Sequence, residues 1–178
     1  MPTRLPIHER IISLRLTSRR RLTLLAEAAV QLAIARVQLK VVPFPRLSSR
    51  WGPFVPAADA RAGDGLLPAS DDRTLTAHMV SDAVLRAARN VPFGAVCLPQ
   101  AMAARRMLER RQIDSVMHFG AAKGTTKPID THAWLDAAGV RVTGYPVAHD
   151  FTEIGCFLCE GHGAQRASQS GGQSVASS

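Results

Sequence analysis

Residues 93–100 are Phe93-Gly94-Ala95-Val96-Cys97-Leu98-Pro99-Gln100. Pro99 falls in the first turn of the helix that this stretch opens, where a missing backbone N–H costs nothing, and apolar residues at helical spacing continue the helix to Arg111. The helix therefore begins at Cys97. Its free N–H groups and positive dipole end favour a thiolate and a developing oxyanion, which is the arrangement that acyl transfer requires.

A histidine follows 35 residues later at the start of an expected strand, in Thr131-His132-Ala133-Trp134-Leu135-Asp136. A thiol is partly ionised near neutral pH, and a neighbouring imidazole favours the thiolate further. The pair therefore predicts acyl transfer or peptide hydrolysis, with Cys97 as nucleophile and His132 as general base. The alternative that these residues leave open is an unreactive buried thiol and a structural histidine.

The strand that holds His132 is predicted to return as a hairpin. Ala137-Ala138-Gly139 forms the turn, and Val140–Thr143 forms the second strand. Because side chains alternate along a strand, Trp134 shares a face with His132. We expect its ring to pack beside the imidazole and to shield the site.

A catalytic imidazole also needs a group that orients it. This group is expected across from His132 on the returning strand, near Thr143 or Gly144. Asp150, a backbone carbonyl and a water are the alternatives. Asp136 shares the face but lies about 13 Å along the strand, which is too far for a hydrogen bond, so it is interpreted as a solvated acid.

Length and composition place the chain among soluble globular proteins. Its 178 residues suit one domain, and 46% of them are hydrophobic. The net charge of +8 is concentrated in residues 4–21, 46–50 and 105–111, so a basic protein associated with nucleic acid is one alternative. No DNA-binding motif accompanies the charge, so we expect no nucleic-acid partner. Three cysteines without a disulfide pattern indicate a reducing cytoplasm.

The N-terminal third is predicted to hold an amphipathic helix that ends before Pro43. Its polar stripe contains Glu27 and Gln31, and its apolar face packs on the core. Arg36 and Lys40 argue against a membrane span. A twin-arginine signal beginning at residues 18–22 and surface attachment to a membrane are the alternatives.

Residues 44–70 are rich in Pro and Gly and are expected to be a connector without long helices or strands. A helix then runs to Asn90, and residues 113–120 form a strand followed by a polar loop over residues 121–128. This pattern predicts helices followed by an antiparallel sheet, the α+β class.

Taken together, these segments resemble a known family. They are the run of residues 97–108, Ile113, and the stretch His132-Ala133-Trp134-Leu135-Asp136, preceded by residues 21–44. They resemble the stand-alone leader peptidase of lasso-peptide biosynthesis, a member of the transglutaminase-like cysteine proteases. The resemblance implies a transglutaminase-like or papain-like α+β fold, with N-terminal helices and a catalytic helix packed on a small antiparallel sheet. The domain would span residues 21–158, between a basic segment (residues 1–20) and a disordered tail (residues 159–178).

The resemblance also implies a reaction and its partners. Cys97 would attack the peptide bond that joins leader to core in a ribosomally made precursor, with His132 as general base and then general acid. A separate winged-helix protein would bind the leader, and a macrolactam synthetase would take the freed core. The basic surface would suit an acidic leader, which charge reversal of Arg105 or Arg106 would test. Many members carry an Asp about twelve residues after the histidine, where this chain has Gly144.

The C-terminal stretch offers a competing motif. Cys156, Cys159 and His162 have zinc-like spacing, but they are only three ligands and a Gly/Ser/Gln tail follows them. The sequence therefore predicts no metal and no cofactor. His118 is expected to line the cleft, whereas His149 is expected at the surface. Besides the peptidase, a non-catalytic peptide-binding module of the same fold is a second hypothesis.

Overall fold

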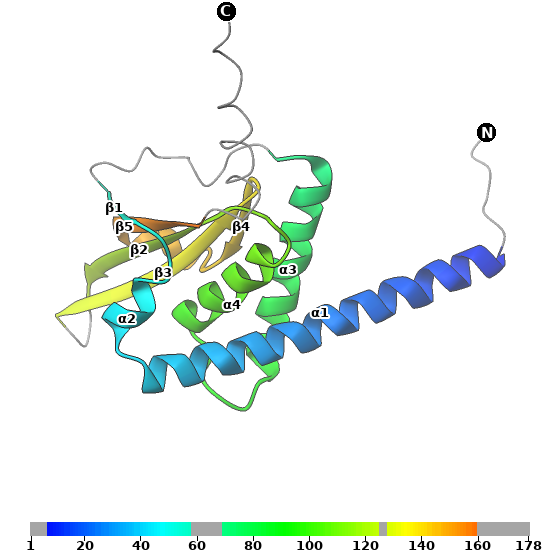
Figure 1. Ribbon diagram of the computed structural model, residues 1–178, viewed down its shortest axis with the longest axis horizontal. Helices are drawn as coiled ribbons and strands as arrows, with labels where there is room; N and C mark the ends of the chain where they lie inside the picture. Colours follow the sequence, from blue (N-terminus) through cyan, green and yellow to red (C-terminus); the bar gives the residue numbers. More distant parts are fainter. Residues whose placement is uncertain (1–6, 58–68, 125–127, 160–178) are drawn as a thin grey trace, which may run out of the picture.

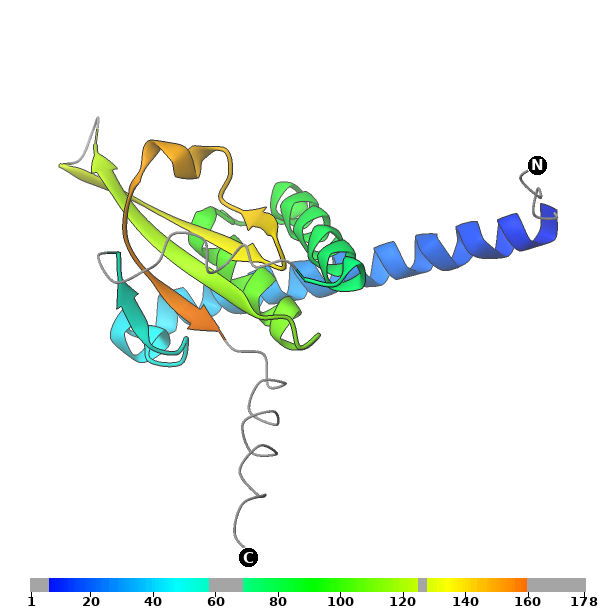
Figure 2. The same cartoon turned by 90° about the horizontal axis from the view of Figure 1, so that it is seen from above.

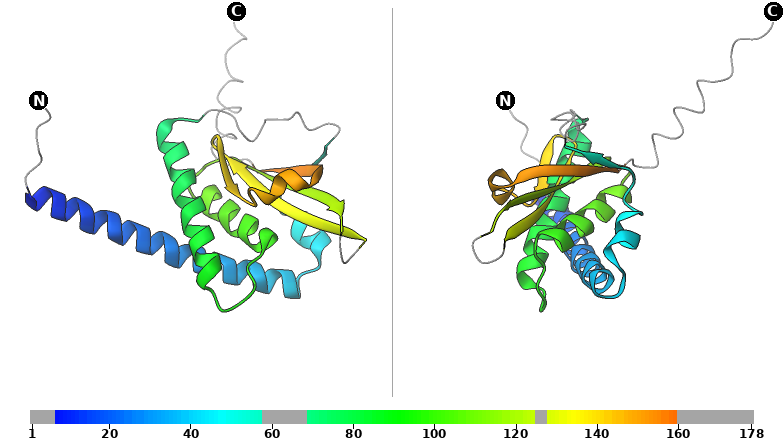
Figure 3. Two further views of the ribbon diagram at one scale, coloured as in Figure 1. Left: turned by 180° about the vertical axis from the view of Figure 1, so that it is seen from behind. Right: turned by 90° about the vertical axis from the view of Figure 1, so that its left-hand side faces the viewer.

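The computed structural model describes residues 7–57, 69–124 and 128–159. Four α-helices lie in this part of the chain: α1 (Ile7–Val41), α2 (Phe44–Ser48), α3 (Asp71–Asn90) and α4 (Cys97–Glu109). They pack against one side of a single sheet, as Figures 1 and 3 show. The expected α+β class is confirmed.

The sheet contains five antiparallel strands in the order β1-β5-β2-β3-β4. They are β1 (Phe54–Pro56), β2 (Ser115–Lys123), β3 (Ile129–Ala137), β4 (Val140–Thr143) and β5 (Thr152–Cys159). A short 3₁₀ helix, η2 (Val147–Asp150), connects β4 to β5. The predicted hairpin is β3 and β4, in which Ala138 and Gly139 take positive φ values in the turn.

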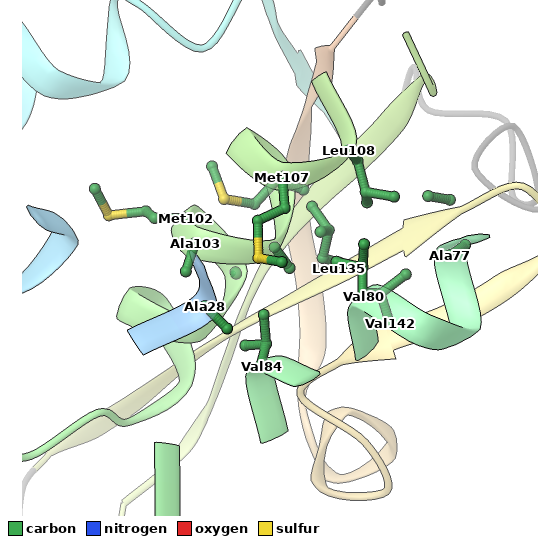
Figure 4. Packing of buried hydrophobic residues seen from close by; sticks show 14 of the residues in the cluster. Ala28, Ala77, Val80, Val84, Met102, Ala103, Met107, Leu108, Leu135 and Val142 are labelled. Atoms are coloured by element: carbon green, nitrogen blue, oxygen red, sulfur yellow. The ribbon is translucent and has the colours of Figure 1, made fainter. Parts of the chain in front are cut away.

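The hydrophobic core lies between the sheet and helices α1, α3 and α4. Leu135 of β3 and Val142 of β4 meet Met107 and Leu108 of α4 there, and Val84 of α3 packs against the same cluster (Figure 4). All five residues are at most 1% exposed. Helix α4 is thus the central helix, in contact with α1, α3 and three strands. This packing fixes the position of its first residue, Cys97.

Truncation of Met107 should destabilise the fold strongly. Met107→Ala removes a fully buried side chain and leaves a cavity, so the free energy of unfolding should fall by about 2–5 kcal/mol. Val37→Ala is the matched control, since Val37 of α1 is 57% exposed, and it should change stability by less than about 0.5 kcal/mol. Urea denaturation measures both variants, and equal effects would contradict this description of the core.

Helix α1 buries Ala28 and Leu32 of the predicted apolar face, but its buried stripe is shifted toward the predicted polar side. Its buried residues are Leu24, Ala28, Gln31, Leu32 and Ala35. Gln31 was expected on the polar side, but it is only 2% exposed. Arg111, just after α4, binds both carboxylate oxygens of Glu27 at 3.2 and 2.7 Å, so the Glu27 side of α1 faces α4.

Helix α1 is long enough to be considered as a membrane-spanning segment. The helix projects well beyond the rest of the domain (Figures 1 and 2) and continues through the basic N-terminal segment to Ile7. Its Arg19–Val41 part is long and apolar enough to cross a membrane, and 28% of that window is buried in the domain. The core helix of a soluble protein and a signal sequence pass the same test, so the absence of a span stays a prediction.

The connector and the strands differ in detail from expectation. Residues 44–57 form α2 and the edge strand β1, both short, as the Pro and Gly content demands. β2 continues three residues beyond Gly120, because its extension pairs with the start of β3. The predicted disordered tail and His162 lie outside the described residues, apart from Cys159 at the end of β5.

Candidate active site

Cys97 is the first residue of α4 and is half-buried. Val96 occupies the N-cap in extended conformation and supplies no side-chain cap, so the first-turn N–H groups of Cys97 and Leu98 have no acceptor within the helix. Gln100 stabilises the approach to this turn, because its amide Nε2 donates to the carbonyl of Ala95 at 2.6 Å. A thiol and uncommitted donors therefore lie together at the positive end of α4.

His132 of β3 is held by three neighbours. Its ring stacks on Phe151, with centroids 5.0 Å apart, and lies beside Trp134 at 6.2 Å. Its Nε2 is 2.8 Å from the carbonyl oxygen of Gly144. Because a carbonyl only accepts hydrogen bonds, Nε2 carries the proton, and in the neutral ring Nδ1 carries the lone pair. The imidazole thus has the tautomer of a general base that acts through Nδ1.

The remaining predicted site residues do not touch this ring by a hydrogen bond. Thr143 pairs with Leu135, and its hydroxyl is buried without a partner, so Thr143 lies on the other side of the sheet. Asp150 ends η2 and is exposed. Of the orienting groups predicted, the structure supplies the backbone carbonyl, that of Gly144.

Gly144 reaches this position only because it has no side chain. Its φ is +89°, and a Cβ built there would lie 2.5 Å from Cβ and 2.8 Å from Cα of Trp134. Both the positive φ and the close approach therefore require glycine. Gly144 thus presents a backbone acceptor to His132 where no side-chain acceptor is available.

Cys97 and His132 lie toward the same end of the domain. β2 leaves the C-terminal end of α4 and runs back along that helix, and His132 pairs with Gly120 in the far half of β2 (Figure 1). Alternation along β3 turns Leu135 toward the helices, and His132 with Trp134 toward the opposite face. Within the described residues, no hydrogen bond joins the Cys97 thiol to the His132 ring.

A second polar group lies beside Trp134 on this face; the sequence pointed to His118 but not to its partners. The ring of His118 stacks on Trp134 with centroids 5.4 Å apart, and its Nδ1 is 2.7 Å from Oε1 of Glu153. Asp136 lies 3.5 Å from the other ring nitrogen and accepts a hydrogen bond from Tyr145 at 2.9 Å. Asp136 is only 5% exposed, so its interpretation as a solvated acid is wrong: residues 144–151 fold over this face.

Burial raises the pKa of Asp136 above its ordinary value of 3.8, although the hydrogen bond from Tyr145 opposes the shift. As the pH rises, Asp136 therefore loses its proton at a lower pH in the unfolded chain than in the folded protein. Between the ordinary pKa and the raised pKa, the free energy of unfolding falls as the pH rises. The Asn side chain of Asp136→Asn does not ionise. The free energy of unfolding of this variant should therefore increase relative to that of the wild type across this pH interval, and the difference should stay constant at higher pH. Tyr145→Phe should widen the interval. Urea denaturation from about pH 3.5 to pH 8 measures this difference, and a flat difference would contradict the assignment.

The basic surface also needs one correction. Arg105 is only 7% exposed, because α4 turns it toward Arg50, whose carbonyl oxygen lies 3.5 Å from its guanidinium. Charge reversal at Arg105 would therefore disturb the fold. Arg106 is half-buried and is the better position for a test of substrate charge.

Comparison with known proteins gives one match. A family model described as the transglutaminase-like superfamily matches residues 38–156, about two thirds of the chain, from the end of α1 into β5. A search of curated proteins and a search of solved structures each gave no match. The matched segment contains Cys97 at the start of α4, His132 on β3 and, between them in the sequence, strand β2. The chain belongs to the transglutaminase-like superfamily.

Proposed function

We propose that this protein is a cysteine peptidase that removes the leader from a ribosomally made precursor of the lasso-peptide type. The observation that carries the proposal is the half-buried Cys97 at the start of the central helix, within a domain of a superfamily that includes cysteine peptidases. Cys156, by contrast, is 3% exposed in mid-strand, where a peptide carbonyl has no access. The likeness of residues 97–108 and 132–136 to the leader peptidases supports the choice of substrate.

In the proposed mechanism, the thiolate of Cys97 attacks the scissile carbonyl, and the first-turn N–H groups of α4 stabilise the oxyanion. His132 accepts the thiol proton at Nδ1 and returns it to the leaving amine, while the Gly144 carbonyl holds Nε2–H. Water then hydrolyses the thioester. In the free protein the thiol and the ring are not hydrogen-bonded, and the ring lies on the sheet face turned away from α4. The proposal therefore requires peptide binding to bring Nδ1 of His132 and Sγ of Cys97 together, a larger change than the tightening of an existing hydrogen bond.

The proposed partners follow from the same resemblance to the leader peptidases. A separate winged-helix protein binds the leader and presents it, as the resemblance to the stand-alone leader peptidases implies. A macrolactam synthetase takes the freed core, and the reaction occurs in the cytoplasm. The basic surface suits an acidic leader, so Arg106→Glu should weaken precursor cleavage at low salt more than at high salt.

The test is a reconstitution. Purified protein, a candidate precursor and the leader-binding partner are mixed, and the products are identified by mass spectrometry. The proposal expects two fragments whose masses sum to that of the precursor plus one water. If the wild type binds the precursor but never cleaves it with the partner present, the protein is a peptide-binding module and the proposal fails.

A further inference from the structure

Three potential metal ligands meet on the face of the sheet turned away from the helices. His118 of β2 lies directly across from Cys156 of β5. A β-bulge then skips Ile154, so that Glu153 pairs with Gly120 and comes to lie on the same face as Cys156. The ligand atoms of His118, Glu153 and Cys156 all lie within 4.8 Å of one another.

This donor set suits zinc. An imidazole nitrogen, a carboxylate oxygen and a thiolate sulfur are the three donor types that Zn²⁺ takes, and bonds of about 2.0–2.3 Å place tetrahedral donors roughly 3.5 Å apart. The three donors lie within 4.8 Å of one another, and Nδ1 of His118 and Oε1 of Glu153 are 2.7 Å apart, so modest side-chain shifts would reach that spacing. The side chain of Glu153 is 34% exposed and gives an ion access from solvent, whereas His118 and Cys156 lie deeper.

The hydrogen bonding around a neutral His118 ring is incomplete. A carboxylate faces each ring nitrogen: Glu153 is 2.7 Å from Nδ1, and Asp136 is 3.5 Å from Nε2. A neutral imidazole has only one N–H to offer them. Nε2 of His118 and Oδ1 of Asp136 are both buried without a hydrogen-bond partner. Buried polar atoms without a hydrogen-bond partner destabilise a fold, and Asp136 is only 5% exposed.

We propose that this face holds a zinc site with Nδ1 of His118, a carboxylate oxygen of Glu153 and Sγ of Cys156 as ligands and a water in the fourth position. Metal at Nδ1 places the ring proton on Nε2, which then donates to Asp136, and the Tyr145 hydroxyl holds Asp136 in place. The Cys156 thiol releases its proton to solvent as the metal–sulfur bond forms. The charges of thiolate and carboxylate then balance Zn²⁺.

The test uses Co²⁺ in place of Zn²⁺, because a cobalt–thiolate bond gives a charge-transfer band in the near ultraviolet. We expect one Co²⁺ per chain, a thiolate band, and displacement of Co²⁺ by Zn²⁺. Cys156→Ser should abolish the band, and Glu153→Gln should weaken affinity tenfold or more. Asp136→Asn should keep the band and weaken affinity about 10–100-fold, the range expected when a ligand's hydrogen-bond partner is lost.

Matched controls separate this site from the other thiols. Cys97→Ser and Cys159→Ser should bind Co²⁺ as the wild type does. Absence of a thiolate band in the wild type would overturn the proposal. So would loss of the band in Cys159→Ser, since the metal would then belong to the Cys156, Cys159 and His162 motif. A band that survives Cys156→Ser would also overturn it, because Cys156 would then not be a ligand. If circular dichroism shows that Cys156→Ser does not fold, the affinity of the Glu153→Gln variant decides.

Discussion

Replacement of Cys97 by Ala should lower the rate of precursor cleavage by roughly 10⁴-fold or more, because no other group can form the thioester. Binding of the precursor should stay within about twofold, since the thiol contributes little contact area. Single-turnover cleavage followed by mass spectrometry measures the rate, and fluorescence anisotropy of a labelled precursor measures the affinity.

The matched control is Cys159→Ser, which changes the thiol at the end of β5 and should cleave as fast as the wild type. Cleavage by Cys97→Ala at an undiminished rate would show that the nucleophile lies elsewhere. Loss of precursor binding in Cys97→Ala would show instead that Cys97 is part of the fold or of the binding surface.

Replacement of Gly144 by Ala should impair both stability and catalysis. The new Cβ would lie 2.5 Å from Cβ of Trp134 and would force a residue with φ of +89° out of its conformation. We expect the free energy of unfolding to fall by about 2–4 kcal/mol. The Gly144 carbonyl would move away from Nε2 of His132, so cleavage by the folded fraction should fall about 100-fold.

Gly94→Ala is the control for this substitution, because a Cβ at Gly94 meets nothing within 4 Å. It should change neither quantity appreciably. A structural role alone would lower the stability of Gly144→Ala and leave the pH dependence of cleavage by the folded protein unchanged. A shifted pH dependence is the sign that the carbonyl orients His132, and an unshifted one would contradict that role.

The sequence predicted the parts of the fold that local patterns encode. Pro99 in a first turn located the start of α4 at Cys97, and the turn before Val140 located the β3–β4 hairpin. Both depend on residues within a few positions of each other. The sequence placed the group that orients His132 near Thr143 or Gly144, but it did not show that this group is the Gly144 carbonyl. The direction of that carbonyl depends on the positive φ of Gly144, and a glycine can adopt either sign of φ.

Other features depended on distant contacts and could not be predicted. Gln31 is buried on the side of α1 where Glu27 pairs with Arg111, 84 residues away, and no local pattern in the sequence reveals that contact. The cluster around His118 depends on the bulge that skips Ile154, since strict alternation would place Glu153 and Cys156 on opposite faces. Periodicity in a sequence contains no record of such a shift in register.

The most direct test of the central claim is to capture the nucleophile. A leader peptide that ends in an acyloxymethyl ketone at the scissile position forms a stable thioether with an activated thiolate, and peptide mapping by mass spectrometry locates the adduct. The mechanism predicts one adduct, on Cys97, which forms about 100-fold more slowly in His132→Asn. An adduct on Cys156 or Cys159, or equal rates in the wild type and His132→Asn, would contradict it.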